Sequence, residues 1–252
     1  MNRFGAFAVH LGISLIIFVV IGYLILFHWY PDFFFTSDGG WQGIRIIAFV
    51  DLVLGPVLTL VVFNKAKPKK ELRRDLSIIG MIQAVCLTAG VWIVYSERPI
   101  AMVFSDGFFN SMSADDYLAA NQPVPDFSAF TDASPHWITV ALPADPVQQA
   151  IIRRQAMERK VPVRTLAEHY VPFETRHVDP DTDGLPLTEL KARDEQTPFL
   201  DGFLARHGGE LTDYAFIPFG TRYSLALLAF HRTDKTLTFL AIPGGIIDAS
   251  AQ

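Results

Sequence analysis

An aspartate inside an apolar segment is the residue of this sequence best placed to do chemistry. Asp51 lies well within the apolar stretch 43–63. A carboxylate at the centre of a membrane-spanning helix costs about 2.5–3.5 kcal/mol on insertion scales, so it normally faces protein or water and has a partner. Pro56 deprives a carbonyl near Asp51 of its usual donor, and Gly55 allows another helix to approach closely. We therefore expect a polar, kinked notch at Asp51, Gly55 and Pro56.

This notch has two interpretations. The functional one is the docking of a transmembrane helix from another protein, which carries a compensating group. The structural one is an internal hydrogen bond from Asp51 to Gln83, Thr88 or Ser14 that holds the helices of this chain together. The residues alone leave both open. Arg45 is six residues from Asp51 and on a different helix face, so we expect it to reach outward to the lipid headgroups.

A second acidic cluster has the opening of a calcium-binding loop. Asp179, Asp181 and Asp183 alternate before Gly184. An EF-hand then requires a glutamate six residues after the glycine, and that position is Leu190. The alternative is an acidic surface turn, in which Asp and Gly suit the backbone geometry. The three aspartates are thus a truncated calcium-loop candidate.

Signs of catalysis are missing from the sequence. It contains no H-E-x-x-H, G-x-S-x-G, Walker or G-x-G-x-x-G motif, and its one cysteine, Cys86, excludes an intrachain disulfide and a multi-cysteine metal site. We expect no catalytic residue, no cofactor and no enzymatic activity. A nucleic-acid partner is also not expected, because residues 96–252 carry a net charge of −8 and no long basic run.

The elements that must position Asp51 are membrane helices. Half of the 252 residues are hydrophobic and 19% are charged, against about 25% in typical soluble domains. Three apolar segments approach or reach the roughly 20 residues that a helix needs to cross a bilayer. They cover residues 9–27, 43–63 and 76–95. The first exceeds the apolar core of a signal peptide, about 7–15 residues, so we interpret it as a retained helix.

Charge predicts the direction of these helices. The loop 64–75 carries six basic residues and is expected to face the cytoplasm, whereas the loop 31–42 has two aspartates and no basic residue. The amino terminus is then cytoplasmic, and residues 96–252 lie in the periplasm of a bacterial inner membrane. The topology determinants are Lys65, Lys67, Lys69, Lys70, Arg73 and Arg74.

Residues 96–252 are predicted to form an α+β domain on an antiparallel sheet. Short apolar runs and turn residues replace the long apolar segments here, and Asp106-Gly107 suits a tight hairpin turn. Ser113 is expected to cap a helix. The strands are expected at 100–104, 108–112, 137–142, 215–219, 223–231 and 236–242, and helices at 145–159 and 187–207, the second weakened at Thr197-Pro198.

Short segments in the first 110 residues also form a familiar pattern. They include Met1-Asn-Arg-Phe4, Trp29-Tyr30-Pro31, Asp51-Leu-Val-Leu-Gly55-Pro56, Glu71-Leu-Arg-Arg-Asp75, Gln83 and Arg98-Pro99. Together they resemble the TfpX/TfpZ family of type IV pilin accessory proteins, whereas residues 110–252 match only in general layout. The resemblance implies a non-enzymatic inner-membrane protein that assists the assembly, stability or presentation of a pilin.

Three functional hypotheses follow. In the first, Asp51, Gly55 and Pro56 contact the transmembrane helix of a type IV pilin subunit, and the outer domain contacts the pilin head. In the second, the chain is a membrane-anchored periplasmic sensor that binds a ligand or calcium, although its short cytoplasmic segments offer no output domain. The third, a membrane enzyme with a periplasmic active site, has no motif in its favour. The lipid bilayer is the other expected partner.

Overall fold

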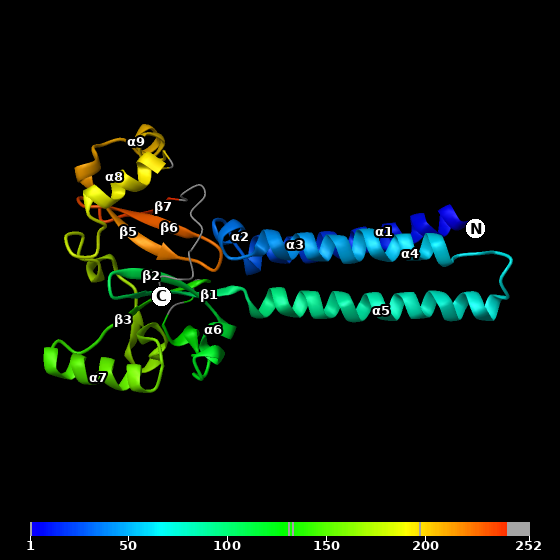
Figure 1. Cartoon of the computed structure of the whole chain (residues 1–252), viewed down its shortest axis with the longest axis horizontal. Coiled ribbons are helices and arrows are strands. Elements are labelled where there is room, and N and C mark those ends of the chain that lie inside the picture. The colour runs from blue at the N-terminus through cyan, green and yellow to red at the C-terminus, as the bar shows by residue number, and fades with distance from the viewer. Residues whose placement is uncertain (1, 131, 133, 197, 241–252) are drawn as a thin grey trace. The chain divides into compact units, whose positions relative to one another are not determined.

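The chain divides into two compact units. The computed structural model describes residues 2–130, 132, 134–196 and 198–240. Unit 1 is Met1–Arg98 and unit 2 is Pro99–Gln252. The division falls between residues 98 and 99, whereas the sequence places it between 95 and 96. Each unit is described below by itself (Figure 1).

Unit 1 consists of long helices that run side by side (Figure 1). Three of them are long and apolar enough to cross a membrane, and each contains most of one predicted span. A short helix, α2 (Phe34–Ser37), lies between the first two. The three are α1 (Arg3–Leu24) with the π-helical η1 (Ile25–Trp29), α3 (Gly40–Ala48) with the π-helical η2 (Phe49–Leu54) and α4 (Gly55–Val62), and α5 (Lys69–Ser96).

The basic loop is shorter than predicted. Helix α5 begins at Lys69, so Lys69, Lys70, Arg73 and Arg74 lie on its first turns and only residues 63–68 are non-helical. The prediction of a loop over 64–75 was therefore wrong in its second half. Lys, Glu, Leu and Arg are all good helix formers, and Pro68 supplies an extended residue just before the first turn.

Unit 2 is an α+β domain, as predicted. Its described residues form a seven-stranded sheet in the order β4-β3-β1-β2-β5-β6-β7. The sheet is mixed rather than antiparallel, because β1 pairs with β3, and β2 with β5, in parallel. Both parallel pairs join strands separated by a helix-containing crossover. The strands are β1 (Pro99–Ser105), β2 (Phe108–Ser113), β3 (His136–Val140), β4 (Tyr170–Pro172), β5 (Tyr214–Gly220), β6 (Leu225–His231) and β7 (Leu237–Leu240).

Local signals determine the turns and caps of unit 2. Asp106 and Gly107 both have positive φ, 55° and 73°, which is the backbone of a type I′ turn between β1 and β2. Ser113 caps α6 (Ala114–Ala119) in a capping box with Asp116. Asp145 caps α7 (Pro146–Glu158), whose first residue is proline. The predicted hairpin turn, the predicted Ser113 cap and the predicted helix over 145–159 are confirmed.

The second predicted helix of unit 2 is two helices. The chain forms α8 (Leu187–Gln196) and α9 (Leu200–His207). Asp194 makes the break, since its Oδ1 accepts the N–H groups of Phe199 and Leu200 at 2.7 and 2.8 Å. The sequence missed β4, which has only three residues. Residues 241 and 242 of the last predicted strand lie outside the described residues.

The sheet of unit 2 is strongly curled and apolar on both faces. Helices α8 and α9 pack on one face of β5–β7, and α6 packs on the same face of β1–β3. The other face carries aromatic rings. Trp137 of β3 and Phe239 of β7 have ring centroids 5.9 Å apart, although five strand steps separate them. A flat sheet would hold them about 24 Å apart at about 4.8 Å per step, so the sheet curls around this aromatic face.

A buried pair of tyrosines in unit 2 is expected to make the stability of this unit depend on pH. The Tyr117 and Tyr170 hydroxyl oxygens lie 2.8 Å apart, and Tyr170 donates to the carbonyl of Arg164. Burial raises the pKa of both phenols above the ordinary value near 10. The unfolded state therefore loses these protons first as the pH rises. The stabilisation is complete below pH 10 and is lost above it, by up to about 1.4 kcal/mol per pH unit for each tyrosine.

Urea unfolding of the full chain at pH 9 and pH 11 measures this effect. Wild type should lose more stability between the two pH values than the double variant Tyr117→Phe, Tyr170→Phe, which has no phenol at either position. The comparison removes the contribution of the other titrating groups, which both proteins share. Equal losses in the two proteins would contradict the prediction.

Candidate functional site: a polar network between the three spans

A network of polar side chains joins all three long helices of unit 1. At its centre Asp51 of η2 is buried, with 1% of its surface exposed. Its Oδ1 accepts hydrogen bonds from Ser14 Oγ of α1 at 2.9 Å and from Gln83 Nε2 of α5 at 2.5 Å. Gln83 lies near the midpoint of α5. One carboxylate oxygen therefore ties together the middle of three helices that each suit a membrane.

His10 and Thr59 extend this network. His10 Nε2 lies 2.7 Å from Gln83 Oε1, and His10 Nδ1 lies 2.5 Å from Thr59 Oγ1. Because Gln83 Nε2 donates to Asp51, its Oε1 is the acceptor for His10 Nε2–H. Nδ1 then accepts from the Thr59 hydroxyl, so a neutral imidazole satisfies every bond. Each group therefore donates to the next one: the Thr59 hydroxyl to His10, His10 to Gln83, and Gln83 to Asp51.

A π-helical turn brings Asp51 to this position. Pro56 has no N–H, and the N–H of Gly55 bonds to the Val50 carbonyl five residues back rather than to Asp51. The Asp51 carbonyl is thereby freed and lies 3.4 Å from Gln83 Nε2. A Cβ at position 55 would overlap the Gln83 side-chain amide. Gln83 thus occupies the space that glycine leaves at position 55, and a side chain there would push the Gln83 amide away from its hydrogen bonds.

The notch predicted at Asp51, Gly55 and Pro56 exists, and α5 of the same chain fills it. All three residues are buried, and Asp51 bonds to two of the three internal partners that the sequence suggested, Ser14 and Gln83. The third, Thr88, lies exposed on α5. Within the described residues, Asp51 Oδ2 is buried and has no hydrogen-bond partner. These contacts favour the structural interpretation of the notch.

Sequence reasoning missed His10 and Thr59. A signal for the first was present, because His10 and Ser14 are four residues apart in an otherwise apolar helix and so share a face. No such spacing pointed to Thr59, because Asp51 and Thr59 share a helix face only as a result of the π turn. Polar residues at helical spacing in an apolar segment are thus the pattern that finds such a network.

The acidic turn of unit 2 uses its carboxylates internally. Asp183 Oδ2 accepts the Asp179 N–H at 2.7 Å, and Asp179 Oδ1 accepts the Asp181 N–H at 3.0 Å. Arg232 Nη1 donates to Asp181 Oδ1 at 2.6 Å. Burial raises the pKa of Asp183. Among the described residues no three His, Cys, Asp or Glu side chains gather as a metal site would require. The interpretation as a surface turn accounts for all of these contacts.

Comparison with known proteins places the chain in a family. It is 31% identical over 115 residues to a fimbrial assembly protein of serogroups C1 and C2 from Dichelobacter nodosus, and the match covers 88% of that relative and 46% of this chain. The chain belongs to the fimbrial assembly protein family.

Two further members of the fimbrial assembly protein family match over a longer stretch. The proteins of serogroups E1 and I from Dichelobacter nodosus are 30% and 31% identical over 134 residues, which is 52% of this chain and 52% of each relative. The chain thus spans about half the length of these two relatives. No protein-family model matches the chain, and no solved structure matches it. The assignment to TfpX/TfpZ within pilus assembly proteins stays a prediction.

Proposed function

We propose that this chain is an accessory protein of type IV pilus assembly in the bacterial inner membrane. In this proposal it binds pilin subunits and catalyses no reaction. The observation that carries the proposal is membership of a family whose relatives are named for fimbrial assembly. Three helices of sufficient length and apolarity supply a membrane anchor, and unit 2 supplies a folded domain that follows it in the sequence.

The ends of the helices support one direction of insertion. Basic residues gather where α4 ends and α5 begins, at residues 65–74. At the opposite end of the helices, the rings of Trp29 and Tyr95 lie 5.3 Å apart, which is typical of an aromatic belt at a membrane surface. Basic residues prefer the cytoplasmic side. The amino terminus is then cytoplasmic and unit 2 periplasmic.

A reporter fusion tests this direction. Alkaline phosphatase joined after Ser96 should be active, because it folds with disulfides only outside the cytoplasm. The same enzyme joined after Lys67 should be inactive. If the fusion after Lys67 is active and the fusion after Ser96 is inactive, the helices insert in the opposite direction. Unit 2 would then lie in the cytoplasm and could not contact a pilin head outside it.

The proposed pilin contact lies on the outward faces of the helices. The polar network lies inside the bundle, so its part in this proposal is to hold the three helices in register. Large apolar side chains such as Ile16 of α1, Val61 of α4 and Val85 of α5 point away from the bundle and are exposed. A pilin transmembrane helix fits such faces by van der Waals packing.

Photo-crosslinking in intact cells tests the pilin contact. A crosslinking residue at position 16, 61 or 85 should attach to pilin from at least one of these positions. The matched controls are Ile47 and Ile79, which are buried on α3 and α5 and should give no pilin adduct. Absence of pilin from every exposed position would contradict the proposal.

A second measurement decides the role of Asp51. Asp51→Asn keeps the size of the side chain and its acceptor oxygen, so pilin should co-purify with this variant as well as with wild type. If a folded Asp51→Asn protein no longer binds pilin, Asp51 contacts pilin directly. Such a contact requires α5 to move out of the notch.

A further inference from the structure

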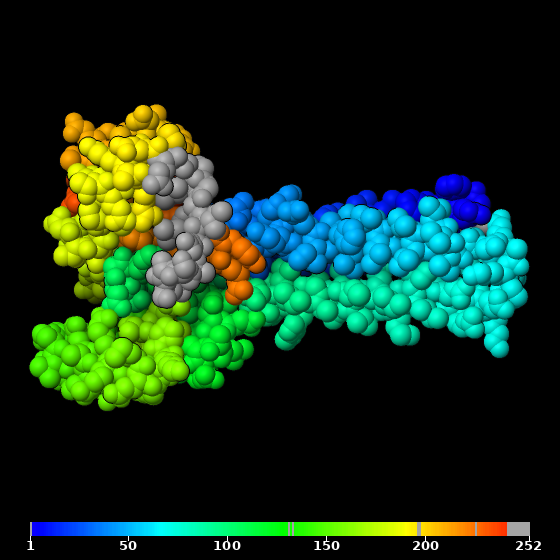
Figure 2. All heavy atoms as spheres, viewed as in Figure 1, coloured from blue at the N-terminus to red at the C-terminus, as the bar shows by residue number. Residues whose placement is uncertain are grey.

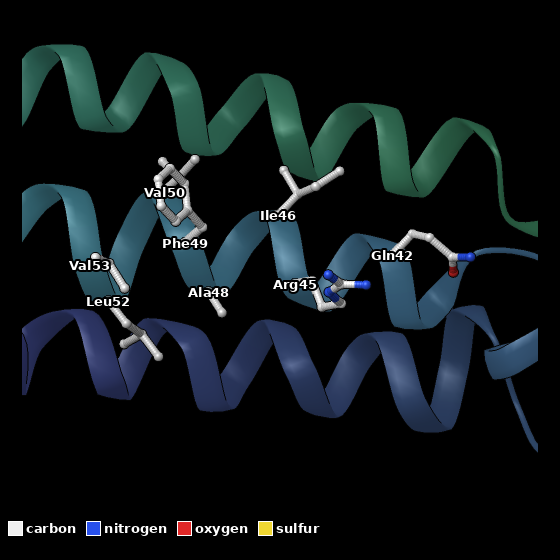
Figure 3. A pocket seen from close by; sticks show the side chains of 8 residues that line it. All are labelled: Gln42, Arg45, Ile46, Ala48, Phe49, Val50, Leu52 and Val53. Carbon is white, nitrogen blue, oxygen red and sulfur yellow. The ribbon is translucent and has the colours of Figure 1, made fainter.

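An open apolar groove runs along the second long helix. Among the described residues its lining comes from α3 and η2, and this hollow, which is open to the outside, has a volume of about 760 Å³. Figure 3 shows Gln42 and Arg45 at one end of the lining row and Phe49, Leu52 and Val53 at the other, between the ribbons of α1 and α5. The groove therefore has a polar end and an apolar remainder.

Arg45 gives the polar end of the groove a positive charge. Its side chain is exposed, and within the described residues no carboxylate lies within 4.0 Å of its guanidinium. An arginine near a hydrocarbon layer is expensive unless it meets an anion. Its planar fork of donors matches the oxygens of a phosphate in a bidentate manner.

The level of Arg45 is that of a lipid headgroup. Trp41 is exposed and lies four residues before Arg45, so both point from the same face of α3. Exposed tryptophan marks the boundary between headgroups and acyl chains. From Arg45 to Val53 the helix rises about 12 Å toward the middle of the membrane. The groove thus begins at the phosphate layer and continues into the layer of the acyl chains.

We propose that this groove binds one anionic phospholipid. The phosphodiester pairs with the Arg45 guanidinium, and an acyl chain lies along Ile46, Phe49 and Val53. An amphipathic molecule with one negative charge matches a groove with one cation and an apolar floor in both shape and charge. This assignment rests on the proposed membrane insertion and is independent of pilin binding.

Native mass spectrometry of the full chain in detergent tests the proposal. The probes are phosphatidylglycerol and phosphatidylcholine with identical acyl chains at equal concentration. Both lipids offer a phosphodiester, but the quaternary ammonium of phosphatidylcholine already balances its phosphate and repels the Arg45 guanidinium. Wild type should therefore retain phosphatidylglycerol over phosphatidylcholine by about tenfold, which is the size of one charge-assisted contact. Arg45→Gln should reduce this preference to near one. Arg45→Lys, which keeps the charge and loses the fork, should give an intermediate value.

Two further variants separate the site from general charge and from misfolding. Arg98→Gln removes a cation that already donates to the Tyr95 carbonyl at 2.7 Å, so it should keep the wild-type preference. Ala48→Trp fills the groove and leaves its charge unchanged, so it should lower retention of both lipids. Circular dichroism confirms that each variant is helical before the lipids are compared.

Several outcomes would overturn the assignment. One is equal retention of the two lipids by wild type, and another is an unchanged preference in Arg45→Gln. Displacement of phosphatidylglycerol by millimolar inorganic phosphate would show that Arg45 binds free phosphate and that the groove contributes nothing. A crosslinker at Phe49 that attaches to a protein helix in cells, together with no lipid preference, would assign the groove to that helix. A negative result in the lipid experiments would not alter the pilin crosslinks expected from positions 16, 61 and 85, so the two proposals can fail separately.

Discussion

Replacing Gln83 by alanine should loosen α5 from the other long helices and lower the free energy of unfolding of unit 1 by about 1.5–3 kcal/mol. The Gln83 amide donates to Asp51 Oδ1 and lies within hydrogen-bond distance of His10 Nε2. Without the amide, a buried carboxylate keeps only its bond from Ser14, and a ring N–H loses its acceptor. Only 11% of the apolar window of α5 is buried, so the polar contacts of Gln83 make up a large part of what holds this helix.

Reversible unfolding of the full chain in mixed detergent and dodecyl sulfate, followed by circular dichroism, measures this loss. Thr88→Ala is the matched control, since Thr88 lies exposed on the same helix and its removal should change stability by less than about 0.5 kcal/mol. The double variant Asp51→Leu, Gln83→Leu should recover part of the loss, because removing both partners leaves no unpaired carboxylate. If Gln83→Ala is as stable as Thr88→Ala, the network does not hold the helices together.

Replacing Phe109 by alanine should destabilise unit 2 by about 3–5 kcal/mol. Phe109 of β2 has no exposed surface and lies at the centre of the aromatic face. Its ring centroid is 4.6 Å from that of Phe104, 5.8 Å from Trp137 and 5.3 Å from Phe173. Alanine removes these contacts and leaves a cavity that the curled sheet closes only in part. The effect is large because Phe109 touches rings from two other strands and the segment after β4.

Trp137 fluorescence reports this unfolding. The other tryptophans, at 29, 41 and 92, belong to unit 1, so a protein with phenylalanine at those three positions has its signal in unit 2. The urea midpoint should fall strongly in Phe109→Ala and change little in Tyr223→Ala, whose side chain is half exposed. Coinciding midpoints would show that Phe109 does not support the curled sheet.

Local patterns predicted the elements of this protein better than their assembly. Apolar length located the three long helices, and Asp106-Gly107 located the hairpin, because these signals act within a few residues. The parallel pairing of β2 with β5 joins residues more than a hundred positions apart, and no local pattern specifies it. Asp51 was identified as the key polar residue, but the choice between an internal and an external partner needed the position of Gln83, which depends on how α5 packs.

The π turn of the second long helix also sets its angular phase. In a regular α-helix each residue advances about 100°, so Asp51 and Thr59, eight residues apart, would differ by about 80°. The widened turn absorbs one residue, and the pair then behaves as if seven residues apart, about 20° from alignment. The side chains on either side of the turn can therefore face the same neighbours, α1 and α5. Inserting or deleting a residue between 49 and 54 would therefore rotate Thr59 relative to Asp51. A change of length in the non-helical segment 63–68 would have no such effect, because no helical turn runs through it.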